Sequence, residues 1–201
     1  MESLFTGLIG AIVGVIFGHY MTVRLVNKKT SLQEQAFYFE LEILLDKYKN
    51  DLVHKFDDFN NPVKNRYVIG APVVDMSLIN ALSIELAGTD KVLNKEVRTL
   101  IIHTTKFAED LVDTAKKREK FREKFNEADA KNTEEYLKLT KQMLRDEVQL
   151  VFYLYKLVKD RNNFRFGGYS NLEMANVACD VAHIAFDTQV WQGICQVVAE
   201  A

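Results

Sequence analysis

Proline and glycine are scarce along most of this chain, and their scarcity favours long helices. The 201 residues include only two prolines, Pro62 and Pro72, and four of the nine glycines lie within the first eighteen residues. Because both residue types interrupt helices, their absence elsewhere predicts few breaks. No segment alternates convincingly between apolar and polar residues, so no sheet is expected. We therefore predict an all-α fold.

Cysteine and net charge are also low. Cys179 and Cys195 would lie about 24 Å apart on one continuous helix, which is too far for a disulfide. Two unpaired thiols are typical of a reducing, cytosolic compartment. A formal net charge of −2 predicts no nucleic-acid partner on bulk charge. The chain lacks a phosphate-binding glycine loop, a zinc motif and a Ser-His-Asp arrangement, so no cofactor, metal or small-molecule substrate is predicted.

One long run, from Leu4 to Val23, has no charged residue. About twenty helical residues span the roughly 30 Å hydrocarbon core of a bilayer. Nothing basic precedes the run, whereas Arg24, Lys28 and Lys29 follow it, and the positive-inside rule then places the C-terminal part in the cytosol. A cleaved signal peptide is disfavoured, because no basic residue precedes the run and no small-x-small cleavage site follows it before Arg24.

These signals predict two parts. Residues 1–29 form a single-pass transmembrane helix with a basic flank and an outer N-terminus. Residues 30–201 form a cytosolic helical domain.

Glycines interrupt the apolar run at regular intervals: Gly7, Gly10, Gly14 and Gly18. The last three are four residues apart and lie nearly on one line of a helix, which lets a second helix approach closely in lipid. The spacing predicts a homo-oligomer. A pore would need several copies, because one helix cannot enclose a channel. Thr6 and His19 could then face its lumen. A plain anchor, with His19 at headgroup level, is the alternative.

An apolar stripe at helical spacing follows the run: Phe37, Leu41, Leu44, Tyr48, Leu52 and Phe56. A capping box at Ser31 and Glu34 predicts a new helix, either continuous with the anchor or bent near Thr30. A short helix is expected over residues 75–87, a long one capped by Thr89 or Asp90, and another capped by Thr133. The charged stretch at 116–125 is expected to project beyond the core. A second capping box, at Ser170 and Glu173, opens the last helix, which is expected to run nearly to the C-terminus as the central helix.

Arg98 and His103 are separated by four residues, the form of the motif in HEPN domains, which are helical bundles. A histidine can move the proton of a ribose hydroxyl and an arginine can stabilise the anionic phosphorane, so the pair is a candidate for RNA cleavage. Thr99 after the arginine and the apolar residues 100–102 depart from active motifs. We therefore judge RNA cleavage unlikely and expect no enzyme.

The whole layout resembles the small accessory proteins of type VI-B, RNA-targeting CRISPR systems. The resemblance rests on a membrane-spanning N-terminus, an all-helical domain, a length near 200 residues and the motif at Arg98 and His103. It implies a HEPN-like fold, a ring-shaped pore in the bacterial inner membrane, and antiviral defence beside an RNA-guided nuclease. A membrane-tethered HEPN ribonuclease and a non-enzymatic adaptor are the alternatives.

Two further groups of residues could carry function. Arg161, Arg165 and Phe166 lie in an irregular stretch and could contact RNA or a partner, or only close a loop over the core. Asp180, His183 and Asp187 would share one face of a continuous last helix. They could bind a metal, but internal salt bridges, to Arg98 or Arg165 for example, are favoured.

Overall fold

The computed structural model describes residues 2–61, 70–123 and 130–195, and the side chains of these residues outside 2–12 and 122–132. The described residues form helices and connecting segments with no strand, so the all-α prediction is confirmed for them. The elements are α1 (Glu2–Asn60), α2 (Ser77–Ala87), α3 (Lys95–Glu123), α4 (Ala130–Asp160), the 3₁₀ turn η1 (Arg161–Asn163), α5 (Asn171–Val181) and α6 (Thr188–Cys195).

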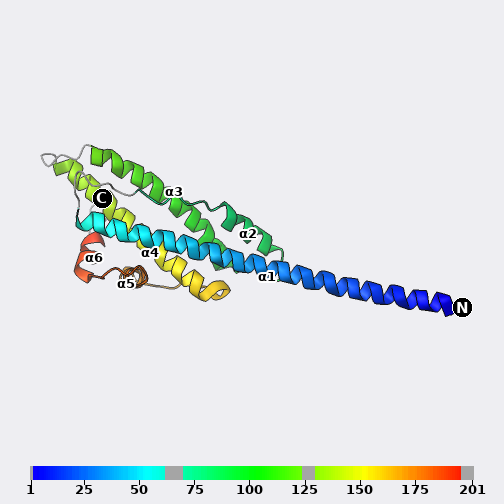
Figure 1. The fold of residues 1–201 in the computed structure, drawn as a ribbon. Coiled ribbons are helices and arrows are strands. Elements are labelled where there is room, and N and C mark those ends of the chain that lie inside the picture. Colours follow the sequence, from blue (N-terminus) through cyan, green and yellow to red (C-terminus); the bar gives the residue numbers. More distant parts are fainter. Residues whose placement is uncertain (1, 62–69, 124–129, 196–201) are drawn as a thin grey trace.

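Helix α1 is a single helix of 59 residues, about 88 Å long at 1.5 Å per residue. It runs through the expected boundary near residue 30, so of the two alternatives left open there the structure has the helix that is continuous with the anchor. No proline or glycine lies near that point, and the local capping signal does not interrupt the helix. Its first half, residues 2–29, projects from the bundle as a lone helix (Figure 1), and we call it the arm.

The arm contains the expected membrane span, but only part of that span can be assessed. In the part of the chain that the structure describes, no helix is both long and apolar enough to cross a membrane. Residues 4–12 of the span have no described side chains, and Thr6, Gly7 and Gly10 lie among them.

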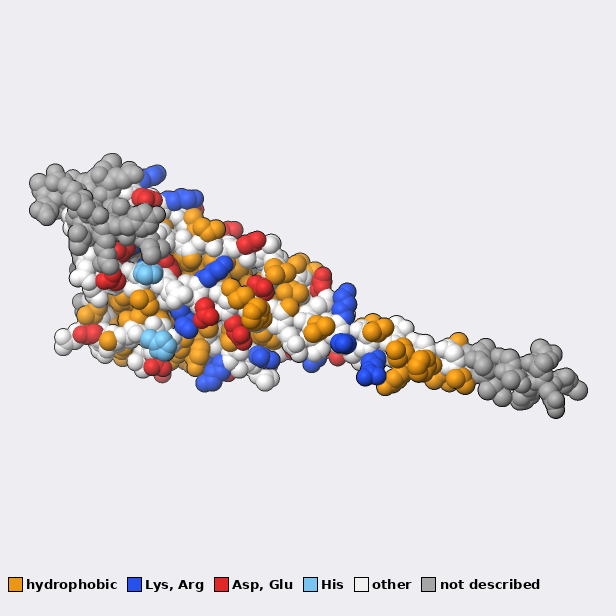
Figure 2. Space-filling model, in the orientation of Figure 1, with side chains coloured by type: hydrophobic (Ala, Val, Ile, Leu, Met, Phe, Trp, Pro, Cys, Tyr) orange, Lys and Arg blue, Asp and Glu red, His pale blue; other side chains and the backbone are white. Residues whose placement is uncertain are grey.

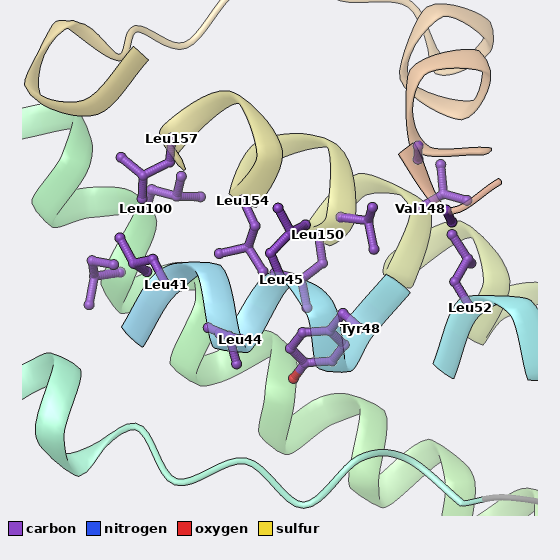
Figure 3. Close-up of a cluster of buried hydrophobic side chains, with 14 of the residues drawn as sticks. Leu41, Leu44, Leu45, Tyr48, Leu52, Leu100, Val148, Leu150, Leu154 and Leu157 are labelled. Carbon is purple, nitrogen blue, oxygen red and sulfur yellow. The ribbon is translucent and has the colours of Figure 1, made fainter. Parts of the chain in front are cut away.

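The second half of α1 supplies one wall of the core. The predicted apolar stripe is buried throughout: Phe37, Leu41, Leu44, Tyr48, Leu52 and Phe56. Figure 3 shows Leu41 and Leu45 of α1 close to Leu150 and Leu154 of α4, with Leu157 beside Leu100 of α3. Burial of such side chains supplies most of the driving force for packing, at about 1.5–3 kcal/mol each.

The central helix is α4, and the prediction that the last helix is central is wrong. Helix α4 packs against α1, α3, α5 and α6. The expected last helix breaks between Val181 and Thr188. His183 there adopts a left-handed conformation, with φ of 57°, and the Ile184 amide donates to the Cys179 carbonyl at 2.8 Å. Histidine tolerates that conformation better than most residues, so the helix ends without a glycine.

The charged end of α3 also differs from expectation. Arg118 lies in the stretch predicted to project beyond the core, but its side chain is buried. The guanidinium lies 3.8 Å from Asp58 of α1 and 5.6 Å from the ring centre of Tyr136 of α4. An arginine can be buried this way because its planar group both pairs with a carboxylate and stacks on an aromatic ring.

Helix α3 begins at Lys95 and is capped by Asn94, and not by Thr89 or Asp90 as predicted. The Val97 amide donates to Asn94 Oδ1 at 2.9 Å, the usual N-cap bond. The Asn94 amide donates to Asn162 Oδ1 at 2.7 Å, and Asn94 Nδ2 donates to the Phe164 carbonyl at 3.2 Å. Asn94 therefore fastens the segment after α4 to the start of α3.

Replacing Asn94 tests this fastening. Asn94→Ala keeps the backbone bond to Asn162 Oδ1 but removes the helix cap and the bonds from Nδ2 to the Asn162 and Phe164 carbonyls, so the free energy of unfolding should fall by about 2 kcal/mol. Urea denaturation followed by circular dichroism measures the loss. The matched control is Asn176→Ala, an exposed residue of α5, which should change stability by less than about 0.5 kcal/mol.

Candidate functional site

Every residue of the arm from 13 to 29 is exposed. The large apolar side chains among them include Val15, Ile16, Phe17 and Leu25, each more than 60% exposed. A Cβ atom added at Gly14 or Gly18 would meet nothing within 4 Å. Within one copy of the chain, residues 13–29 of the arm, with Gly14 and Gly18 among them, therefore have no protein cover.

His19 and Thr22 are the polar side chains of the described arm ahead of its basic flank. His19 is exposed. The Thr22 hydroxyl donates to the Gly18 carbonyl at 2.9 Å, within the helix itself. Because the Thr22 hydroxyl already has a hydrogen-bond acceptor within its own helix, it does not require water and can lie in an apolar environment.

Arg98 and His103 are both exposed on α3. Within the described residues Arg98 makes no ion pair, so the salt bridges considered for it with Asp180 or Asp187 do not form. His103 lines a cavity between α3 and α4, and Arg98 does not. The five-residue offset points the two side chains in different directions around the helix. One copy of the chain therefore does not bring the candidate catalytic pair to a common pocket.

The cavity between α3 and α4, which we call the α3–α4 cavity, has a volume of about 170 Å³. Two elements of the bundle and one loop residue line it: Thr99, Leu100, His103, Thr104 and Phe107 of α3, Gln149, Leu150 and Tyr153 of α4, and Phe166. The walls are apolar and aromatic, with hydroxyl, amide and imidazole groups between them. Such a composition is typical of small-molecule sites.

Phe166 is held at the cavity by the segment after η1. Its backbone amide donates to the Glu96 carboxylate, and the Arg165 guanidinium lies 3.6 Å from the same carboxylate. Its ring packs edge-on against Tyr153 and Phe164, with centroids 5.6 and 5.1 Å away. Edge-to-face pairs of this kind are favourable. Two residues singled out separately in the sequence, His103 and Phe166, thus meet at one cavity.

Arg161 is separated from that surface. Its guanidinium lies 5.2 Å from the ring centre of Tyr38 on α1, and its own backbone has φ of 51°. Burial, together with the Glu34 carboxylate, raises the pKa of the Tyr38 hydroxyl to about 12, against the opposing charge of Arg161. Arg161 therefore packs on α1, whereas Arg165 and Phe166 pack near α3, so the three do not form one contact surface.

Asp180, His183 and Asp187 do not share a helical face, because the helix breaks between them. All three are exposed. Asp187 caps α6, since the amides of Gln189 and Val190 donate to its Oδ1 at 2.7 and 3.2 Å. The part of the chain that the structure describes contains no group of histidine, cysteine and carboxylate side chains able to hold a metal.

Charged side chains inside the bundle were not identified from the sequence. We call them the ionic cluster: Asp51, Lys55 and Asp58 of α1, Arg118 of α3 and Glu147 of α4. Lys55 Nζ pairs with the Asp51 carboxylate and lies 3.0 Å from Glu147 Oε2. Lys55 is 1% exposed and Glu147 is fully buried. The signal was present in the sequence, because Glu147 interrupts the apolar stripe of Leu144, Val148 and Val151.

Burial sets the ionisation of the cluster. It raises the pKa of Glu147 to about 7, whereas the charges of Lys55 and Arg118 act in the opposite direction. Burial also lowers the pKa of Lys55, against the attraction of Glu147. Taking either charge out of water is costly, and the attraction between the two offsets that cost only while both partners are present.

No protein-family model, curated protein or solved structure matches this chain. The resemblance to the type VI-B accessory proteins therefore stays a prediction.

A double-mutant cycle tests the Lys55–Glu147 pair. Lys55→Met leaves the Glu147 carboxylate buried without its closest cation and should lower the free energy of unfolding by about 3–5 kcal/mol. Lys55→Met with Glu147→Leu should recover most of the loss. Chemical denaturation measures all four corners of the cycle. A loss in the double variant equal to the sum of the two single losses would show that the pair is not coupled.

The raised pKa of Glu147 predicts a pH dependence. Between about pH 4.5 and 7, folded Glu147 keeps a proton that the unfolded chain releases, so its contribution to stability is full at low pH and declines as the pH rises. As the pH rises through this range, the unaltered chain should therefore lose up to about 3 kcal/mol of stability relative to Glu147→Gln, which cannot ionise. Denaturation at several pH values measures it. Glu109→Gln, at an exposed position of α3, should show no such trend.

Proposed function

We propose that this chain is a membrane effector that assembles into homo-oligomers through its arm. The observation that carries the proposal is the exposure of every described arm residue from 13 to 29, including large apolar side chains. Figure 2 shows these side chains on a helix that extends away from the bundle. A lone amphiphilic helix in water is marginally stable, so lipid or other copies of the arm should cover it.

The glycine line supports self-association over a plain anchor. Gly14 and Gly18 lie on one face of the arm, and the backbone there is open to close approach by another helix. Helices in lipid associate through small residues of this kind. Since the Thr22 hydroxyl is satisfied within its own helix, this face can also lie against lipid or a second arm.

The base of the arm supports an orientation. Arg24, Lys28 and Lys29 are exposed where the arm meets the bundle, and Figure 2 shows the basic side chains gathered there. Basic groups at this point are attracted to anionic lipid headgroups on the cytoplasmic side. The bundle would then lie in the cytosol, directly against the membrane.

In this proposal several arms surround a pore, with Thr6 and His19 as candidates for its lining. The resemblance to type VI-B accessory proteins suggests a role for such a pore, which is to depolarise the bacterial inner membrane during antiviral defence. Its partners would be further copies of itself, the bilayer, and an RNA-guided nuclease or the RNA of that nuclease.

A HEPN ribonuclease is the second candidate. It is favoured by the exposure of both Arg98 and His103 on α3, which leaves them free to meet the same residues of another copy. That arrangement needs a symmetric dimer, whereas a pore needs a larger ring. A stable monomer bound to a partner protein would instead favour the adaptor.

The arm proposal predicts the effect of enlarging its glycines. Gly14→Leu with Gly18→Leu should leave the bundle folded, since nothing in one copy lies near these positions. The same change should block close helix approach, reduce the oligomer in detergent to smaller species, and reduce ion leakage from phosphatidylethanolamine–phosphatidylglycerol vesicles at least tenfold. Light scattering and a potential-sensitive dye measure the two effects.

A matched control enlarges the opposite face of the arm. Ile16→Phe with Val23→Leu lies about 180° away around the helix and should keep both assembly and leakage. Glycine variants that still assemble and still depolarise vesicles would refute the proposal. A dimer that cleaves single-stranded RNA, and loses that activity in His103→Ala, would replace it with the ribonuclease.

A further inference from the structure

The α3–α4 cavity holds a buried hydroxyl group without a hydrogen-bond partner. Thr104 is fully buried, and its Oγ1 contacts no donor or acceptor among the described residues. Other threonines of these helices donate to the carbonyl four residues earlier: Thr105 at 3.1 Å, Thr114 at 2.8 Å and Thr140 at 2.9 Å. A buried hydroxyl left unpaired is costly, so the exception at Thr104 needs a cause.

We propose that the α3–α4 cavity binds a small, neutral, planar aromatic molecule that carries one hydrogen-bonding group, a ligand of the phenol class. Thr104 lines this cavity. In the bound state, rotation about its Cα–Cβ bond would turn the hydroxyl toward the ligand. The ligand's polar group then satisfies the threonine hydroxyl. The sequence motifs predicted no small-molecule site, because none of the lining residues belongs to a known ligand-binding motif.

The volume of the cavity sets the size of the ligand. Its 170 Å³ is close to the roughly 150 Å³ of an apolar cavity that accepts benzene. A single six-membered ring with one substituent therefore fits, and a nucleotide or a fatty acyl chain does not.

The lining of the cavity sets the chemistry of the ligand. No Asp, Glu, Lys or Arg is among the lining residues, so nothing there offsets the desolvation of a charged ligand. Phe107, Tyr153 and Phe166 present aromatic rings, which favour a flat aromatic guest in an edge-to-face arrangement. Gln149 and His103 add polar groups that can contact its substituent.

The entrance also supports a ligand site. Phe166 is 41% exposed although it lines the cavity, and the segment that carries it is fastened to α3 through Glu96 and Asn94. At Phe166 the wall of the cavity is therefore formed by a loop residue that hydrogen bonds hold in place, and not by a packed helix. This inference does not depend on the membrane proposal, because the cavity lies in the bundle and not in the arm.

Binding of phenol to the full chain in detergent micelles tests the proposal, with toluene as the probe that lacks the hydroxyl. We expect saturable binding of both by ligand-observed NMR, and ring-current shifts of the Leu100 and Leu150 methyl groups. Thr104→Val removes the hydroxyl and keeps the shape. It should weaken phenol about fivefold, the value of one neutral hydrogen bond, and leave toluene unchanged. Thr105→Val, whose hydroxyl is bonded within α3, should bind both probes as the unaltered chain does.

Two further measurements make the outcome decisive. Thr99→Phe fills the cavity from its half-buried rim and should abolish binding of both probes. The ligand-free Thr104→Val variant should be at least as stable as the unaltered chain, because it loses only an unpaired hydroxyl. The proposal is overturned by an absence of saturable binding, by binding that survives Thr99→Phe, by equal phenol affinity in Thr104→Val, or by a marked loss of stability in that variant.

Discussion

The packing of the second half of α1 on α4 is the interaction on which the rest of the structure depends. One unbroken helix links the exposed arm to this buried stripe, so the position of the arm follows from how α1 sits on the core. A hinge near residue 30 would uncouple the two, and the structure has none. If the arms assemble, their arrangement therefore fixes the arrangement of the attached bundles. A change in how α1 packs within the bundle would likewise reorient the arm.

The ionic cluster restricts that packing to one register. Apolar stripes tolerate small sliding movements, because one leucine can replace another in a contact. Lys55 and Glu147 cannot slide in this way, since separating them leaves two unpaired charges in the interior. The pairing of Arg118 with Asp58 joins α3 to the same arrangement. Burial of apolar side chains thus stabilises the core without fixing a register, and a few ion pairs fix how the helices align.

Local signals predicted several features correctly. The Phe37–Phe56 stripe, the Ser170–Glu173 capping box and the end of α2 at Gly88 all depend on neighbouring residues, and the structure has each of them. The prediction failed where a local signal competes with a stronger context. Ser31 and Glu34 could form a capping box, yet they lie inside a helix that nothing interrupts. His183 could continue a helix, yet the chain turns there and Asp187 begins another.

The helical class, the apolar stripe of α1 and the charge-free run of the arm follow from residue type and a period of 3.6, so the amino-acid sequence is enough to predict them. Tertiary structure is needed to know which helix is central and which charges are buried. It also brought His103 and Phe166 to one cavity and left Arg98 outside it. Those outcomes depend on contacts between residues far apart in the chain, such as Asn94 with Asn162 and Lys55 with Glu147. The spacing of residues within a single helix does not indicate which distant residues will be in contact.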